Sequence, residues 1–186
     1  MSEPTVAVLW HVTMSLDGFI AAPGDRMDWI FRYKGPNPLV GEVIQSIGAI
    51  LAGRRTFNVG DQPDVPPEAS KAYGGAWTGP IFVLTHHPPS SPDPAITFLS
   101  GDIRAAVARA SAAAKGKSVV LFGADIARQC FEAGLVDEIW IHVAPILLGD
   151  GVRLFGHEGT ASVQLETRDV SQAGQITNLR FRVVKD

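Results

Sequence analysis

The sequence predicts an α/β protein with a mostly parallel central sheet, helices on both faces and a C-terminal antiparallel hairpin. Short apolar runs, such as residues 119–122, are typical of strands that are buried on both faces. Several of these runs are followed by glycine and then by apolar residues at helical spacing. The last run instead alternates apolar and polar side chains, which is typical of an antiparallel strand near a sheet edge.

Composition limits the number of domains and the kind of partner. With 186 residues, 46% of them hydrophobic, the chain suits a single domain over residues 1–186. A net charge of −3 with scattered Lys and Arg argues against nucleic acid or an anionic membrane as a partner, so a small molecule is expected. No leader pattern opens the sequence and no apolar stretch reaches about 18 residues, which favours a cytoplasmic location.

The first half of the chain predicts two strands that end in polar turns. Residues 6–13 form an apolar strand that runs into a polar loop at residues 15–20, and residues 13–20 are a reasonable wall of a ligand site. Asn37 and Pro38 are typical of a helix start, and the helical stripe that follows is closed by Gly48. Residues 49–52 then form a strand that leads into a glycine and a helix start at residues 53–57.

The middle of the chain contains an excursion and then regular elements. Residues 61–79 are rich in Pro and Gly, which predicts a surface excursion with one short helix at residues 67–73. Strands are expected at residues 81–84 and 96–99. Residues 101–115 predict an alanine-rich helix with Asp102 in its first turn.

Residues 118–155 contain the unit around which the other elements are arranged. A buried strand ends at Gly123, a helix with Cys130 on its apolar face ends at Gly134, and a second strand covers residues 138–144. The single cysteine excludes an internal disulfide framework, and its position favours core packing. Residues 162–170 and 176–184 predict the hairpin, with Asn178 on a solvated face.

Anion binding is predicted at the two glycine turns. The turn at Gly123 places the free N–H groups of Ala124 and Asp125 at a helix N-terminus, and the turn at Gly53 adds the guanidiniums of Arg54 and Arg55. An ordinary strand-to-helix turn and a solvated arginine pair are the alternatives. Neither the Gly-x-Gly-x-x-Gly nor the P-loop pattern occurs, so another phosphate-binding fold is needed.

Histidines give no metal-site pattern. His11 and His142 lie within apolar strands and are expected to be hydrogen-bonded core residues, while His86, His87 and His157 lack metal-ligand spacing. No metal is assigned.

The chain resembles the dihydrofolate reductase-like fold, and within it the C-terminal reductase domain of the bacterial bifunctional riboflavin-biosynthesis deaminase-reductase and its stand-alone relatives. Four motifs carry the resemblance, in order and each at a strand end: MSLDGFIA at residues 14–21, GRRTF at 53–57, LFGA at 121–124 and PILLG at 145–149. The chain lacks the zinc-binding His-x-Glu and Pro-Cys-x-x-Cys pattern, so no deaminase domain is expected.

The resemblance implies NADPH as hydride donor and a homodimer as the assembly. It places residues of the first loop beside the nicotinamide, the two glycine turns on the phosphates and a short polar segment near the adenosine ribose. The implied cofactor-binding residues are Thr13, Leu16 and Gly18; Gly53, Arg54, Arg55 and Thr56; Gly123, Ala124, Asp125 and Ile126; and Thr85 and His86. A guanidinium of Arg54 or Arg55 suits the 2′-phosphate of NADPH, although His86 stands where relatives often have serine or arginine.

Two carboxylates are candidate catalytic residues. The riboflavin-type reductases resemble this chain through Asp17, whereas dihydrofolate reductase places an acidic residue on its first helix, roughly where Asp28 falls. A carboxylate can organise a water and hold an amino-heterocycle, and burial is expected to raise its pKa toward the working pH. For Asp17 with Gly18, a plain turn is the alternative.

Three functions remain open at this point. The first is an NADPH-dependent reductase of a pterin-like or ribosylamino-pyrimidine-like heterocycle. The others are a reductase of an unrelated small molecule and a non-catalytic NADPH-binding module on the same fold.

Overall fold

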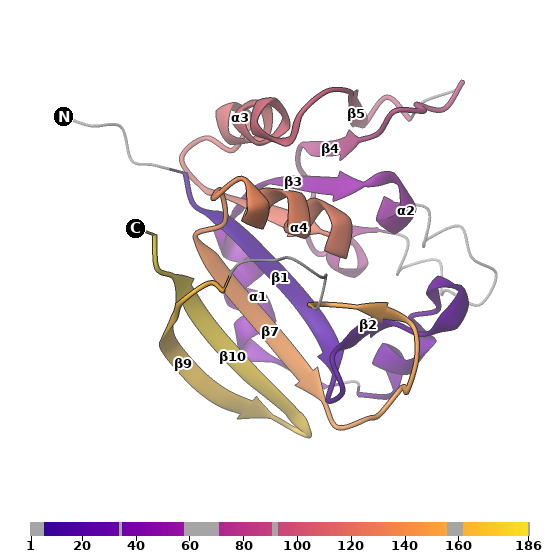
Figure 1. Cartoon of the computed structure of the whole chain (residues 1–186), viewed down its shortest axis with the longest axis vertical. Coiled ribbons are helices and arrows are strands. Elements are labelled where there is room, and N and C mark those ends of the chain that lie inside the picture. The colour runs from indigo at the N-terminus through magenta and orange to yellow at the C-terminus, as the bar shows by residue number, and fades with distance from the viewer. Residues whose placement is uncertain (1–5, 34, 58–70, 91–92, 156–161, 186) are drawn as a thin grey trace.

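The fold is described from a computed structural model that covers residues 6–33, 35–57, 71–90, 93–155 and 162–185. Its main sheet has eight strands in the order β5-β4-β3-β6-β1-β7-β10-β9. All neighbours from β5 to β7 are parallel, and β10 pairs antiparallel with both β7 and β9. The predicted mostly parallel sheet with a C-terminal antiparallel hairpin is confirmed (Figure 1).

The strands of this sheet are β1 (Val8–Ser15), β3 (Ile47–Gly53), β4 (Ile81–Leu84), β5 (Ile96–Leu99), β6 (Ser118–Phe122), β7 (Glu138–Ala144), β9 (Leu165–Ala173) and β10 (Ile176–Val183). The helices are α1 (Pro38–Ser46), α2 (Arg54–Phe57), α3 (Ile103–Ala113) and α4 (Ala124–Glu132), with short 3₁₀ helices η1 (Pro23–Asp25), η2 (Asp28–Arg32) and η5 (Ala72–Gly75). A separate two-stranded sheet pairs β2 (Phe19–Ala21) with β8 (Val152–Arg153).

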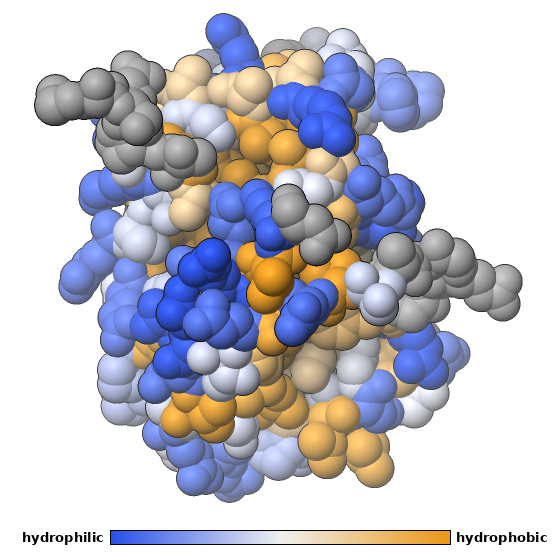
Figure 2. All heavy atoms as spheres, turned by 60° about the vertical axis from the view of Figure 1, so that its left-hand side comes forward, coloured by the Kyte–Doolittle hydropathy of each residue, from blue (hydrophilic) through white to orange (hydrophobic). Residues whose placement is uncertain are grey.

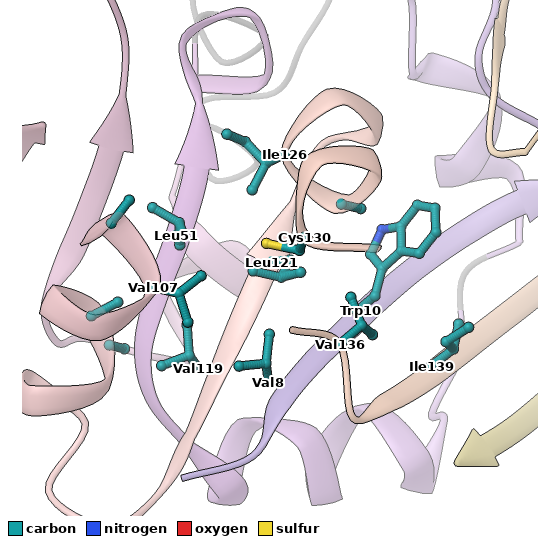
Figure 3. Packing of buried hydrophobic residues seen from close by; sticks show 14 of the residues in the cluster. Val8, Trp10, Leu51, Val107, Val119, Leu121, Ile126, Cys130, Val136 and Ile139 are labelled. Carbon is teal, nitrogen blue, oxygen red and sulfur yellow. The ribbon is translucent and has the colours of Figure 1, made fainter. Parts of the chain in front are cut away.

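Helices cover both faces of the main sheet. On one face, α3 and α4 pack against alternate residues of β1, β3 and β6, and Figure 3 shows Cys130 of α4 lying over Leu121 of β6. Burial raises the pKa of the Cys130 thiol to about 12, which agrees with the expected core role. On the other face, Leu39 and Val43 of α1 pack against Leu9 and Trp140. Each fully buried aliphatic side chain contributes about 1.5–3 kcal/mol to folding.

Local signals set most helix boundaries correctly. The side chain of Asn37 accepts a hydrogen bond from the Leu39 N–H at 3.2 Å, and Asp102 caps α3 in the same way. The boundary predicted at Gly48 is wrong, since α1 ends at Ser46 and Gly48 lies within β3. A side chain there would overlap the Ala114 carbonyl after α3, so close packing accounts for this glycine. Most of the short helix predicted at residues 67–73 lies outside the described residues.

The hairpin forms one edge of the sheet. Nearly every residue of β9 is exposed, and Val163, Leu165 and Val170 are exposed apolar residues there. Figure 2, which brings the side of the molecule with the hairpin forward, shows apolar surface interrupted by hydrophilic side chains. The hairpin turn is shorter than predicted, since β9 continues to Ala173.

Candidate functional site

Two glycine turns lie at neighbouring strand ends. Gly53 ends β3 directly before α2, and Gly123 follows β6 directly before α4. Because β3 and β6 are parallel neighbours with Ala52 opposite Phe122, both turns lie at the same edge of the sheet. Ligands of open α/β sheets bind outside this edge.

The two turns contact each other closely, and the turn at residue 123 requires glycine. A Cβ on Gly123 would overlap Thr56 Oγ1, and a Cβ on Gly53 would lie 3.2 Å from Ile126 Cγ1. Gly123 also has φ of 101°, which L side chains rarely adopt. Thr56 and Gly123, predicted separately as phosphate-binding residues, are thus brought together.

The N-terminus of α4 fits a phosphate group. Gly123 provides no side-chain cap, so the first-turn N–H groups of Ala124, Asp125 and Ile126 have no partner within the helix. The carboxylate of Asp125 would oppose an anion, but it accepts hydrogen bonds from Arg128 and Gln129, each at 2.7 Å. The ion pair with Arg128 offsets part of its charge.

The two neighbouring arginines diverge. The Arg54 guanidinium carbon lies 5.8 Å from the ring centre of Phe98 on β5. Arg55 is exposed and its Nε donates to Asp25 of η1 at 2.6 Å. Thr85 and His86 follow β4, the neighbour of β5, so Arg54 extends toward the side of the sheet where the adenosine ribose is expected.

Asp17 joins two loops. Its Oδ1 accepts hydrogen bonds from Ser15 Oγ at 2.5 Å and from the Leu148 N–H at 3.1 Å, and its Oδ2 accepts one from the Gly149 N–H at 2.8 Å. We call these four residues the Asp17 clasp. The clasp connects the predicted motifs at residues 14–21 and 145–149.

The clasp contradicts the expected pKa of Asp17. The hydrogen bond from Ser15 and those from the N–H groups of Gly149 and Leu148 outweigh desolvation and lower the pKa to about 2. The predicted rise is wrong because the carboxylate lies among hydrogen-bond donors and not in an apolar pocket. Asp17 is therefore ionised near neutral pH.

Backbone bonds around the clasp hold the same loops together. The Leu16 N–H donates to the Ile146 carbonyl at 2.9 Å, and the Leu154 N–H donates to the Gly18 carbonyl at 2.8 Å. The side chains of Leu16 and Leu147 are left 64% and 70% exposed, which offers apolar surface beyond the end of β1.

Asp28, the second candidate, lies in a different setting. It begins η2, its Oδ1 is 3.6 Å from Arg26 Nε, and its side chain is 41% exposed. An exposed pair of this kind is weak. The catalytic roles of Asp17 and Asp28 both stay predictions.

A hydrogen-bonded series of side chains crosses the α1 face of the sheet. His11 Nδ1 lies 2.9 Å from Tyr73 Oη, His11 Nε2 lies 2.6 Å from His142 Nε2, and His142 Nδ1 lies 2.6 Å from Asn178 Oδ1. Asn178 exchanges hydrogen bonds with Asn37, the cap of α1. We call these five residues the polar chain.

The polar chain was only partly predicted. His11 and His142 are hydrogen-bonded core residues, as expected, and burial is the main cause that lowers the pKa of each. The expectation that Asn178 faces solvent is wrong: it is 2% exposed, because the start of α1 covers this part of β10. The available signal was His11, Thr13 and Ser15 at alternate positions of an apolar strand, which indicates one polar stripe on that face.

Other features lie apart from these groups. A hollow of about 640 Å³ lined by residues including Gly48, Trp77 and Pro80 lies at the amino ends of β3 and β4, opposite the glycine turns. Within the described ranges, no three His, Cys, Asp or Glu side chains converge as metal ligands. No helix in the same ranges is long and apolar enough to cross a membrane.

Solved structures share this fold. A protein from Shewanella sp. PV-4, provisionally named for riboflavin biosynthesis, aligns over 97% of this chain and 100% of its own, with a TM-score of 0.78 and 22% identity. A pyrimidine reductase-like protein from Corynebacterium diphtheriae aligns over 98% and 94%, with a TM-score of 0.66 and 15% identity. Dihydrofolate reductase from Enterococcus faecalis, complexed with NADP(H), aligns over 96% and 97%, with a TM-score of 0.60 and 14% identity. The expected dihydrofolate reductase-like fold is confirmed.

Sequence comparison gives the family. The uncharacterized protein YwjB of Bacillus subtilis is 29% identical over 174 residues, which cover 92% of this chain and 94% of the relative. The pattern of the RibD C-terminal domain matches residues 6–179. The chain therefore belongs to the RibD C-terminal domain family.

Proposed function

We propose that the protein is an NADPH-dependent reductase that transfers a hydride to a small heterocycle of the pterin or ribosylamino-pyrimidine type. Membership of the RibD C-terminal domain family supports a riboflavin-type reductase. Similarity to a pyrimidine reductase-like protein and to a dihydrofolate reductase complexed with NADP(H) supports the reaction and the cofactor.

The interlocked glycine turns carry the cofactor assignment. A Cβ on Gly123 would overlap Thr56 Oγ1, and a Cβ on Gly53 would lie 3.2 Å from Ile126 Cγ1, so the packing of α2 against α4 favours glycine at both turns. The free N–H groups at the N-terminus of α4 support pyrophosphate binding beside these turns. We assign Gly53, Arg54, Arg55 and Thr56, and Gly123 through Ile126, to the phosphates, and Thr85 with His86 to the adenosine ribose.

NADPH, when bound, supplies the hydride, and the residues of the chain position the reactants. Thr13, Leu16 and Gly18 form the wall beside the nicotinamide, and the Asp17 clasp fixes the loop that carries Leu16 and Gly18. A carboxylate has about four acceptor positions, and the clasp uses three of them. The remaining position can accept a hydrogen bond from an amino group of the substrate, so Asp17 positions the heterocycle and does not donate a proton.

Nucleotide preference tests the cofactor assignment. Replacing Arg54 by Ala should weaken NADPH binding by about 1.5–3 kcal/mol and leave NADH binding nearly unchanged, because a hydrogen bond to the charged 2′-phosphate is lost. Arg55→Ala is the matched control and should have a smaller effect, since Arg55 is paired with Asp25. Fluorescence quenching titrations measure all four affinities. Equal losses for both nucleotides, or none, would remove this role from Arg54.

The phosphate turn gives a second test. Gly123→Ala should abolish measurable NADPH binding, because the added Cβ displaces Thr56 and the backbone is strained. Gly134→Ala is the control: Gly134 has φ of 68° with open space around it, so strain alone should cost about 1 kcal/mol of stability. Oxidation of NADPH with a panel of heterocycles then separates the proposed reductase from a non-catalytic NADPH-binding module.

The assembly is proposed from the family resemblance, and the location is the one expected from the sequence pattern. We propose a homodimer in the cytoplasm. Sedimentation of the purified protein at micromolar concentration tests the first, and a single monomeric species would contradict it.

A further inference from the structure

The hydrogens of the polar chain all point in one direction, and the cap of α1 sets that direction. The Leu39 N–H donates to Asn37 Oδ1, so the Asn37 amide nitrogen must face Asn178. That nitrogen donates to Asn178 Oδ1 at 2.9 Å, which identifies the Asn178 atom beside His142 as an oxygen. An oxygen 2.6 Å from His142 Nδ1 requires a hydrogen on that nitrogen.

The same logic continues to Tyr73. Neutral His142 with a hydrogen on Nδ1 has a bare Nε2, so His11 Nε2, 2.6 Å away, carries the next hydrogen. His11 Nδ1 is then bare and must accept from Tyr73 Oη at 2.9 Å. The hydroxyl hydrogen of Tyr73 is thus committed to His11, and only lone pairs remain on its oxygen.

One contact could favour the opposite direction, but it is weaker. Asn37 Nδ2 approaches His142 Nδ1 at 3.3 Å and could donate to it. A bare Nδ1 would then face the Asn178 oxygen at 2.6 Å, lone pair against lone pair. The shorter contact therefore decides the direction.

Tyr73 lies near residues that are assigned to the cofactor. Its ring packs 5.7 Å from that of Phe122, the residue before the phosphate turn, and stacks on His11 with ring centres 5.6 Å apart. His11 lies two residues before Thr13 on the same face of β1, and Thr13 is opposite His142 on β7. Tyr73 is only partly buried and has a left-handed backbone, φ 52°, which a non-glycine residue adopts at a cost.

We propose that Tyr73 Oη accepts a hydrogen bond from a ring N–H of the substrate, and that the polar chain makes Tyr73 selective for heterocycles with such a donor. This inference rests on the proposed function and adds a specificity residue to it. The donor on the substrate is the N–H group of a planar lactam or aminopyrimidine ring. A ring nitrogen without hydrogen is disfavoured, because the Tyr73 hydrogen is already used by His11.

The direction of the chain is tested without any substrate. Long-range ¹H–¹⁵N spectra of the NADPH-loaded protein at pH 7.5 distinguish the two neutral forms of each imidazole. We expect hydrogen on Nε2 of His11 and on Nδ1 of His142. The opposite form of either ring would overturn the proposal.

Selectivity is tested with two probes that differ at the two ring nitrogens, which carry hydrogen in 5,6-diaminouracil and methyl groups in its N1,N3-dimethyl derivative. Affinities for the NADPH-loaded protein are measured by calorimetry in the wild type, Tyr73→Phe and Tyr33→Phe. The wild type should bind the parent uracil about three- to tenfold more tightly, the range expected for one neutral hydrogen bond. Tyr73→Phe should lose this preference and keep its NADPH affinity.

Tyr33→Phe is the matched control, because its hydroxyl donates to the Pro145 carbonyl at 3.3 Å and lies outside the polar chain. It should keep the preference. A preference that survives in Tyr73→Phe, or NADPH-loaded protein that binds neither probe, would overturn the specificity proposal. Absence of NADPH binding in the wild type would instead contradict the proposed function.

Discussion

Two polar clusters lie near the end of β1, and they are built in opposite ways. The Asp17 clasp is charged and joins two loops: Ser15 is two residues from Asp17, and the other two donors are backbone N–H groups of the loop after β7. The polar chain is neutral and joins β1, β7, β10, the start of α1 and η5. The difference shows that one strand can contribute both to a charged cluster that fixes a loop and to a neutral series of hydrogen bonds with one direction.

The largest expected effect comes from the charged cluster. Asp17→Asn should lower turnover roughly a hundredfold or more, because an amide cannot accept all three hydrogen bonds of the clasp and the loop loses its position. Single-turnover hydride transfer measures the loss. Asp28→Asn is the control and should change the rate little, since Asp28 is half exposed and weakly paired.

The pH profile separates positioning from proton transfer in the same variant. Because the pKa of Asp17 is about 2, the wild-type rate and the Asp17→Asn rate should depend on pH in the same way above pH 5. If the wild-type rate changes with pH in a range where the Asp17→Asn rate does not, this carboxylate titrates during catalysis.

Acid should destabilise the neutral cluster first. The pKa values of His11 and His142 are lowered in the folded state, so the unfolded chain takes up protons first as the pH falls below about 6.5. The contribution of the two histidines to the free energy of unfolding is therefore fully present above pH 6.5. Up to about 2 kcal/mol of it should be lost between pH 6.5 and 5.5. Denaturant unfolding at these two pH values measures the change.

The clasp should respond only at a much lower pH. The contribution of Asp17 to the free energy of unfolding is present above its ordinary pKa of 3.8 and is lost as the pH falls toward 2.

The histidine contribution is tested by substitution. His142→Gln should reduce the loss of stability near pH 6, while His87→Ala, which alters an exposed side chain, should leave that loss unchanged. If the loss of stability near pH 6 is as large in His142→Gln as in the wild type, it is caused by other groups.

The smallest expected effect compares two helix caps. Asp102→Ala should cost about 1 kcal/mol, the usual cost of losing an N-cap. Asn37→Ala should cost about 2 kcal/mol, because Asn37 caps α1 and also serves Asn178 in the polar chain. Equal costs for the two variants, measured by denaturant unfolding, would show that the chain does not depend on its cap.

Features that depend on neighbouring residues in the sequence could be predicted, whereas features that depend on residues far apart in the sequence could not. Caps such as Asn37 and glycine turns such as Gly123 depend on a few adjacent residues, so their patterns were sufficient. Family motifs indicated Asp17 as a candidate, but its pKa depends on Leu148 and Gly149, which are more than a hundred positions away. No local pattern specifies such partners.

The polar chain was missed for the same reason. His11 and His142 are 131 positions apart, and Asn37 and Asn178 are 141 apart. The alternation of apolar and polar residues in β10 predicted the strand correctly but predicted the exposure of Asn178 wrongly. Such a pattern cannot show that α1 begins over Asn178. The order of the strands had to be known before these side chains could be placed together.

The exposed strand β9 has a consequence for the growth of assemblies. An edge strand offers unpaired N–H and C=O groups to any other strand, and Glu166, Arg168 and Asp169 place charges along it that discourage such pairing. If two copies pair their β9 strands about a twofold axis, each edge is consumed by the other and addition stops at two chains. Without these charges, the edge would pair less selectively with other strands.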